Sequence, residues 1–250
     1  MSARQTALRG ARRLGVESKL RATHQATQRV FEGRARRRSR RDDDNLLFLF
    51  PFLLRADDNC IDVGANVGEV LVDMVRAAPD GRHIAYEPLP ELAAKLRDRF
   101  PEVDVRNAAL SDRRGEAEFF RVKEAPSRSG LRTEPDPGGT VEPIVVATEQ
   151  LDDVLDDDFV PALIKIDVEG AEALVLEGAI ETLARHKPIV ALEHGDTARM
   201  YGTTHGDVHA LLCDRAGLRV FDMDGGGPYS RDAFEKACAD GARWNWLARA

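Results

Sequence analysis

The sequence predicts an α/β fold with an open parallel sheet, and three observations support this prediction. From residue 59 onwards, short apolar segments typical of strands alternate with longer segments of helical periodicity. The first strand, at 59–63, leads through a glycine turn into a helical pattern that stops at Pro79. The second strand, at 83–86, ends in the acidic residue Glu87. This succession is typical of sheets that bind a nucleotide-like ligand at the ends of their strands.

The composition indicates a soluble globular chain. Its 250 residues have room for one α/β domain with a sizeable core, and 43% of them are apolar and 32% charged. The three cysteines, Cys60, Cys213 and Cys238, are far apart and do not pair with histidines at metal-binding spacing. The spacing therefore indicates neither a disulfide framework nor a zinc site, and we expect a reducing, cytoplasmic setting.

Charge divides the chain into two predicted regions. Residues 1–41 have a net charge of about +11, whereas the remainder has about −18. We expect an Arg-rich N-terminal extension at 1–44, helical or partly disordered, and a folded domain at 45–250. For the basic run at 34–41, the alternatives are a contact with nucleic acid, with an anionic membrane surface or with the acidic domain, or a solvated extension. The extension lacks a secretory signal but has the composition of an organelle transit peptide.

The segment from Leu46 to Leu54 is the most apolar run in the chain. It is about half as long as a membrane span, and Pro51 interrupts it. We therefore expect no transmembrane segment here and predict a lid that packs over the sheet edge or near the ligand. A membrane-dipping or partner-binding patch is the alternative.

The turn after the first strand has the residue pattern of a ligand-binding glycine turn. Gly64 removes a side chain where the backbone approaches a ligand, and Gly68 allows the following helix to pack closely. Free N–H groups at the start of that helix can bind the polar end of a cofactor. The predicted cofactor contacts in this turn are Asp62, Gly64, Ala65, Asn66 and Gly68.

The acidic residue after the second strand indicates the class of cofactor. A carboxylate at Glu87 can accept hydrogen bonds from both ribose hydroxyls of an adenosine. The Gly-x-Gly-x-x-Gly fingerprint of dinucleotide binding is absent, because Asn66 occupies its middle position. An adenosine cofactor without a pyrophosphate is therefore predicted, and S-adenosylmethionine fits this best. Pro88 beside Glu87, and Asn107 and Ala108 on the adenine side, are the further candidate contacts.

A buried strand at 162–166 is followed by a second group of ionisable residues. Lys165 lies in the strand, and Asp167 and Glu169 come directly after it. Ligands in open α/β sheets bind outside the carboxyl ends of the strands, so these groups are placed where chemistry would occur. The Ser- and Gly-containing loop at 125–140 is either part of an acceptor mouth or a flexible connection.

Several of these motifs together match one family pattern. The matching segments are Asp62-x-Gly64-x-Asn66-x-Gly68, Glu87-Pro88, 107–110, 151–155, the Lys-Ile-Asp-Val-Glu-Gly-Ala-Glu block at 165–172, Glu193-His194 and 244–248. In these residues the chain resembles the FkbM family of S-adenosylmethionine-dependent methyltransferases, over about 45–250. The resemblance implies a class I methyltransferase fold, a Rossmann-like seven-stranded sheet in the order 3-2-1-4-5-7-6 with the last strand antiparallel and helices on both faces.

The rest of the sequence supplies the elements that such a sheet needs. Further strands are expected at 103–106, 116–122, 141–148, 188–193, 218–223 and 244–248. Helices are expected at 90–100, at 151–155, from Ala171, in a segment ending at Gly217, and after the capping residue Ser230.

The resemblance also implies a reaction. Family members mostly methylate hydroxyl oxygens, so the expected acceptor is a small hydroxylated molecule, such as a sugar, lipid or natural product. Asp167 and Glu169 would face the transferred methyl group, where one of them orients the ammonium of the cofactor or accepts the hydroxyl proton. His194 is the other candidate base. Asp167, Glu193 and His194 could hold a divalent ion, but no spacing requires it, and no metal is predicted.

Three other functions compete with this one. A nucleic-acid amino-methyltransferase needs an Asn/Asp-Pro-Pro-aromatic loop after the fourth strand, where this chain has residues 167–170, and its acidic domain repels phosphate. A nicotinamide oxidoreductase needs the missing fingerprint. A non-catalytic adaptor on a methyltransferase fold, with the basic tail for an anionic partner, is the remaining alternative.

Overall fold

The computed structural model describes residues 41–42, 45–133, 138–241 and 243–250. The chain divides into two compact units, at 1–41 and 42–250, and only Arg41 of the first unit is described. The Arg-rich extension predicted at 1–44 and its basic run at 34–41 therefore lie outside the described residues, apart from Arg41 and Asp42. All strands described below belong to the second unit.

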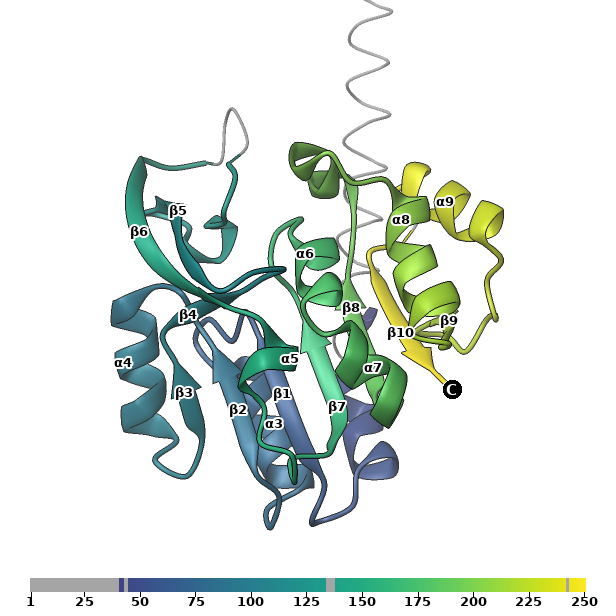
Figure 1. The fold of residues 1–250 in the computed structure, drawn as a ribbon, viewed down its shortest axis with the longest axis horizontal. Coiled ribbons are helices and arrows are strands. Elements are labelled where there is room, and N and C mark those ends of the chain that lie inside the picture. The colour runs from purple at the N-terminus through teal and green to yellow at the C-terminus, as the bar shows by residue number, and fades with distance from the viewer. Residues whose placement is uncertain (1–40, 43–44, 134–137, 242) are drawn as a thin grey trace, which may run out of the picture. The chain divides into compact units, whose positions relative to one another are not determined.

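A seven-stranded sheet forms the centre of this unit (Figure 1). Its order is β3-β2-β1-β7-β8-β10-β9, parallel from β3 to β8, with β10 antiparallel to both of its neighbours. Counting β7 to β10 as the fourth to seventh strands confirms the predicted order 3-2-1-4-5-7-6. The strands are β1 (Asn59–Val63), β2 (His83–Tyr86), β3 (Asp104–Arg106), β7 (Pro161–Ile166), β8 (Ile189–Glu193), β9 (Arg219–Asp222) and β10 (Asn245–Arg249).

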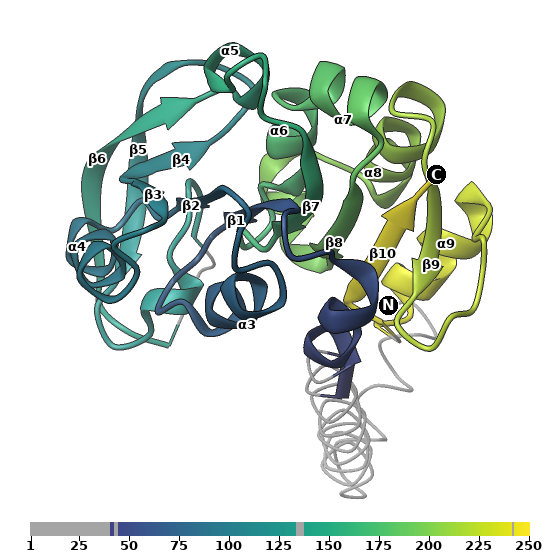
Figure 2. The ribbon, with the colours of Figure 1, turned by 90° about the horizontal axis from the view of Figure 1, so that it is seen from below.

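Helices cover both faces of the sheet (Figure 2). Successive side chains of a strand point to opposite faces, so Cys60 and Ile61 of β1 belong to different cores. The core of Cys60 also contains residues of α3 and of the 45–53 helix, whereas the core of Ile61 contains residues of α6, α7, α8 and α9. The helix bounds are α3 (Glu69–Ala77), α4 (Pro90–Arg99), α5 (Leu151–Val154), α6 (Glu172–Glu177), α7 (Ile180–His186), α8 (His205–Ala210) and α9 (Arg231–Ala239).

The apolar segment before β1 is helical at 45–53. Leu46, Phe50 and Leu54 recur every four residues, and all three are buried against the sheet face that α3 also covers. Phe48 and Phe52 lie on the opposite side, 70% and 74% exposed, with ring centroids 5.5 Å apart. The segment thus packs on a face of the sheet through one stripe. Within the described residues, no helix has the length and apolarity needed to span a membrane.

A second, three-stranded sheet lies beyond the end of β3. It has the order β4-β6-β5, with β4 parallel and β5 antiparallel to β6. Two of its strands, β5 (Gly115–Val122) and β6 (Val141–Glu149), match the predictions at 116–122 and 141–148. The third, β4 (Ala108–Leu110), was not predicted as a strand.

Two predicted helices are each divided in the structure. The helix predicted from Ala171 forms as α6 and α7, separated at Gly178, where an added Cβ would lie 2.0 Å from the carbonyl oxygen of Ser111. The segment predicted to end at Gly217 forms as α8 followed by a π-helical turn at Leu211–Arg215. Before α9, the hydroxyl of Ser230 accepts a hydrogen bond from an N–H of the first turn, as the sequence predicted.

Candidate active site

A cavity of about 250 Å³ lies at the carboxyl ends of β1, β2 and β7. Its walls also include β4, β5 and the loops that follow β5 and β7. This is the position at which open α/β sheets bind ligands. Its polar side chains include Asn66, Glu87, Ser127, Asp167, Glu169 and Glu193.

Close packing explains the glycines of the turn after β1. Gly64 and Gly68 both have φ of 79°, in the left-handed region that favours glycine. A Cβ on Gly64 would lie 2.0 Å from the carbonyl oxygen of Asp167, so the two loops touch through their backbones. A Cβ on Gly68 would lie 2.8 Å from side-chain atoms of Leu96 and Phe100. The turn is therefore shaped by contacts with α4 and with the loop after β7.

Glu87 is held by this turn. Its Oε2 accepts a hydrogen bond from the N–H of Asn66 at 2.8 Å, and its Oε1 accepts one from the N–H of Leu89 at 2.9 Å. The side chain is buried but lines the cavity. Burial raises the pKa of Glu87 to about 7, although the two backbone hydrogen bonds oppose this shift. Each carboxylate oxygen keeps a further acceptor position, which a ligand hydroxyl can occupy.

Lys165 joins the β1 turn to the loop after β7. Its Nζ donates to the carbonyl oxygen of Gly64 at 3.0 Å and forms ion pairs with Asp62 at 3.2 Å and Asp167 at 3.5 Å. Burial alone would lower the pKa of Lys165, but the two carboxylates outweigh burial and raise it. Lys165 therefore stays charged and fixes the carboxylate of Asp167, which lines the cavity.

The loop after β7 has two consecutive residues with positive φ. Glu169 has φ of 54° and Gly170 of 105°. A Cβ on Gly170 would lie 2.6 Å from the carbonyl oxygen of Thr197. The N–H of Gly170 donates to Oε1 of Glu172 at 2.7 Å. Non-glycine residues in this region cluster at functional sites, where the surrounding structure holds them. The loop is thus fixed in a conformation that places Glu169 in the cavity lining.

The structure places the predicted site residues in two groups. Lining the cavity are Gly64, Asn66, Glu87, Pro88, Ala108, Asp167 and Glu169. Outside the lining are Asp62, Ala65, Gly68, Asn107 and His194. Asn107, predicted on the adenine side, instead donates its side-chain N–H groups to the carbonyl oxygens of Glu87 at 2.9 Å and Pro88 at 2.8 Å. It braces the segment that presents Glu87.

His194, a candidate base, does not reach the cavity. Its side chain has no exposed surface, and its Nδ1 lies 3.2 Å from Oε2 of Glu172. Its Nε2 lies 3.0 Å from Nδ1 of His205, and its ring stacks on Phe234. The preceding residue, Glu193, lines the cavity instead. Strand alternation separates the two, because neighbouring side chains leave a strand on opposite sides.

Several residues of the site carried no recognisable signal in the sequence. Tyr86, Leu89, Leu110, Phe119 and Leu131 supply apolar wall. In the sequence, nothing distinguishes these residues from ordinary residues of a hydrophobic core. A second cavity, of about 190 Å³, is lined by Leu46 and Leu47 of the 45–53 helix and shares Asp167 and Glu193 with the first. The apolar segment therefore contributes to a cavity next to the predicted site.

The sheet order, the antiparallel β10 and the site at the strand ends together define a class I methyltransferase fold. The model of the methyltransferase FkbM domain matches residues 62–220. The chain belongs to this family.

Two similar proteins have names that bear on the family. The 2-O-methyltransferase NoeI of Sinorhizobium fredii (strain NBRC 101917 / NGR234) is 28% identical over 166 residues, which cover 58% of this chain and 66% of that protein. The crystal structure of methyltransferase FkbM from Methylobacillus flagellatus KT superposes with a TM-score of 0.50 and 19% identity, covering 79% of this chain and 45% of that one. The chain thus spans less than two thirds of either relative.

Proposed function

We propose that the chain is an S-adenosylmethionine-dependent methyltransferase that methylates a hydroxyl oxygen of a small molecule. The observation that carries the proposal is the buried carboxylate of Glu87, held by two backbone N–H groups at the edge of the cavity. The family and the fold support the reaction class. The name of the relative NoeI, a 2-O-methyltransferase, supports oxygen as the methylated atom.

The residues of the cavity suit this cofactor. Glu87 would accept hydrogen bonds from the ribose hydroxyls through its remaining acceptor positions. Leu89, Ala108 and Leu110 would form an apolar wall for the adenine ring. Asp167, fixed by Lys165, would hold the ammonium group. When bound, the cofactor supplies an electrophilic methyl group on a sulfonium.

The remaining acidic residues of the cavity suit the acceptor side. Glu169 would accept the proton of the attacking hydroxyl, because the strained loop after β7 holds it in the lining. Glu193, which lines both cavities, would orient the acceptor. Alignment of the hydroxyl with the methyl group would supply much of the rate enhancement. The acceptor would be a hydroxylated sugar, lipid or natural product.

Calorimetric titration with S-adenosylhomocysteine tests the cofactor and its site. We expect micromolar binding by the wild-type chain, weakened at least tenfold, or about 1.4 kcal/mol, in Glu87→Ala. Glu102→Ala is the matched control, because Glu102 is exposed and outside the cavity lining. No binding by a well-folded chain would refute the proposal and leave the adaptor function. An equal loss of affinity in Glu87→Ala and Glu102→Ala would refute the role of Glu87 in binding the cofactor.

The binding of S-adenosylhomocysteine should also depend on pH, because burial raises the pKa of Glu87 to about 7. Ribose hydroxyls donate to the ionised carboxylate, so below a pH of about 7 binding must first release a proton. The dissociation constant for S-adenosylhomocysteine should rise up to about tenfold per pH unit as the pH falls below this value, and be level above it. Glu87→Gln, which cannot titrate, should bind weakly with a flat profile between pH 6 and 8. If the dissociation constant of Glu87→Gln changed with pH as steeply as that of the wild type, the proton released on binding would belong to another group.

A further inference from the structure

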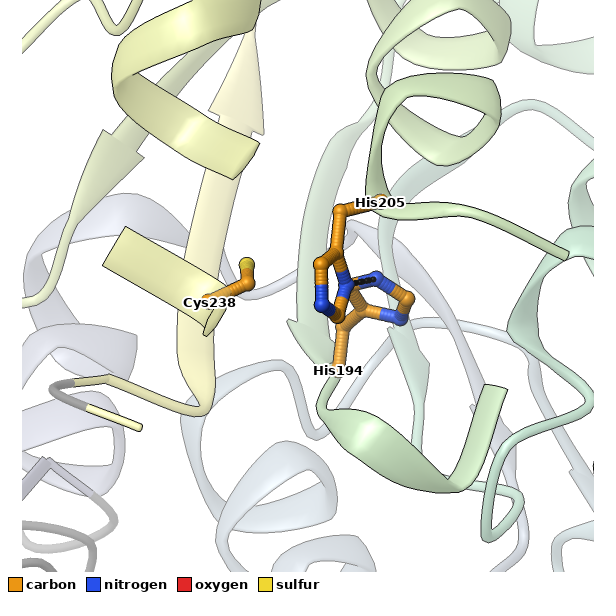
Figure 3. Close-up of side chains that lie close together, drawn as sticks. All are labelled: His194, His205 and Cys238. Carbon is orange, nitrogen blue, oxygen red and sulfur yellow. Dashed lines mark hydrogen bonds between the residues drawn. The ribbon is translucent and has the colours of Figure 1, made fainter. Parts of the chain in front are cut away.

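Three side chains that are distant in the sequence meet beside β10 (Figure 3). His194 follows β8, His205 is the first residue of α8, and Cys238 lies near the end of α9. One ligand atom of each side chain lies within 4.8 Å of those of the other two. The two rings meet edge to face, with centroids 5.0 Å apart. This group is called the His-His-Cys cluster.

The cluster is shielded from solvent, and one of its ring nitrogens has an unmet hydrogen-bonding capacity. His194 and Cys238 are each 1% exposed, and the side chain of His205 is 11% exposed. Nε2 of His205 is buried and has no hydrogen-bond partner among the described residues. Oδ1 of Asp196 lies 3.6 Å from this nitrogen, on a side chain that is 63% exposed.

The arrangement of protons around the two rings points to a cation. Glu172 lies 3.2 Å from Nδ1 of His194, and Asp196 lies 3.6 Å from Nε2 of His205. The carboxylate of Glu172 favours a proton on Nδ1 of His194, which leaves a lone pair on Nε2. This lone pair accepts a hydrogen bond from Nδ1–H of His205 at 3.0 Å, so a metal ion bound between the two rings would displace one proton. Histidines that bind a metal typically show this pattern, with the outer nitrogen directed at a carboxylate.

We propose that the His-His-Cys cluster binds one divalent metal ion of the Zn²⁺ class. Imidazole and thiolate are the donors that Zn²⁺ prefers, and three protein ligands plus a water complete a tetrahedral set. Ligand atoms of such a site lie about 3.3 to 3.6 Å apart, so shifts of roughly 1 Å would close the cluster. The ion would cross-link the end of β8 to α8 and α9, on the opposite side of β8 from the cavity that Glu193 lines.

A zinc titration of the chelator-treated full-length chain tests the site. We expect one Zn²⁺ per chain by mass spectrometry of the metal, a sub-micromolar dissociation constant by competition with a chromophoric chelator, and a higher melting temperature with Zn²⁺. Loading with Co²⁺ should give a thiolate-to-metal absorption band, which reports Cys238 as a ligand without any mutation. The site is independent of the proposed reaction, because none of these readouts uses methyl transfer.

Matched variants assign the ion to the cluster. Cys238→Ser and His205→Asn should each weaken Zn²⁺ binding at least tenfold, and Cys238→Ser should remove the Co²⁺ band. Cys213→Ser is the control, because Cys213 lies 3.5 Å from His209 in a Cys-His pair that has no third ligand among the described residues. If Cys238→Ser does not fold, the more exposed His205→Asn and the wild-type Co²⁺ spectrum still decide. Absence of stoichiometric binding by the wild type, or equal binding in all variants, would overturn the proposal.

Discussion

Replacing Gly64 by alanine should lower the free energy of unfolding by at least about 3 kcal/mol and abolish cofactor binding. Backbone strain and steric overlap both destabilise alanine at this position. The φ of 79° strains any residue that has a Cβ, and the Cβ itself would lie 2.0 Å from the carbonyl oxygen of Asp167. The overlapping atom belongs to the backbone, so it cannot rotate away. Relief requires the β1 turn and the loop after β7 to separate, which breaks the hydrogen bond of Lys165 to Gly64.

Gly225→Ala is the control that separates backbone strain from steric overlap. Gly225 has φ of 85°, close to that of Gly64, but an added Cβ would meet nothing within 4 Å. The Gly225→Ala variant should therefore lose only about 1 kcal/mol of its free energy of unfolding. Urea denaturation of both variants, followed by titration with S-adenosylhomocysteine, measures the difference. A Gly64→Ala variant no less stable than Gly225→Ala would show that the two loops can move apart freely.

Replacing Glu169 by glutamine should lower kcat by a factor of about 100 to 10,000. Glutamine keeps the shape of the side chain and its hydrogen-bonding capacity but cannot accept the hydroxyl proton. The positive φ of 54° is unchanged, so the loop should keep its conformation. The measurement is the methylation rate with any acceptor that the wild-type chain uses, together with the dissociation constant for S-adenosylhomocysteine.

The role of Glu169 is distinguished from that of Asp167 by which constant changes. Glu169→Gln should leave cofactor affinity within about threefold, whereas Asp167→Asn should mainly weaken cofactor binding, by at least about tenfold. Glu116→Gln, on the exposed side of β5, is the control that should change neither. An unchanged kcat in Glu169→Gln would assign the base to another residue of the cavity.

Much of the sheet could be predicted from the sequence, because its strands are apolar runs bounded by turn residues and its motifs resemble a family of known strand order. β4 was missed for a physical reason. Ala108–Leu110 is only three residues long, and it pairs in parallel with β6, more than thirty positions later. Local periodicity contains no information about such a pairing. The division at Gly178 was also missed, since the close approach of Gly178 to Ser111 joins residues that are far apart in the sequence.

Which residues line the candidate site was predictable where their position follows from the end of a strand, and less so where it depends on the direction of a side chain. Glu87, Asp167 and Glu169 follow strands directly, and the carboxyl ends of parallel strands meet at one edge of a sheet. His194 also follows a strand, but its side chain points into the core beside α8 and α9. Strand alternation predicts that Glu193 and His194 point to opposite sides, but the sequence does not show which of the two faces the cavity. Nor does cysteine spacing reveal a cluster whose members come from three elements.

The position of β10 has a consequence for how the chain is made. β10 lies between β8 and β9, although both precede it in the sequence, and Trp246 is completely buried there. During synthesis from the N-terminus, β8 and β9 therefore emerge without their shared neighbour, and their facing edges stay unpaired until 245–249 leaves the ribosome. The half of the sheet from β3 to β7 can pair earlier, whereas the half that holds the His-His-Cys cluster has to assemble after translation of these residues.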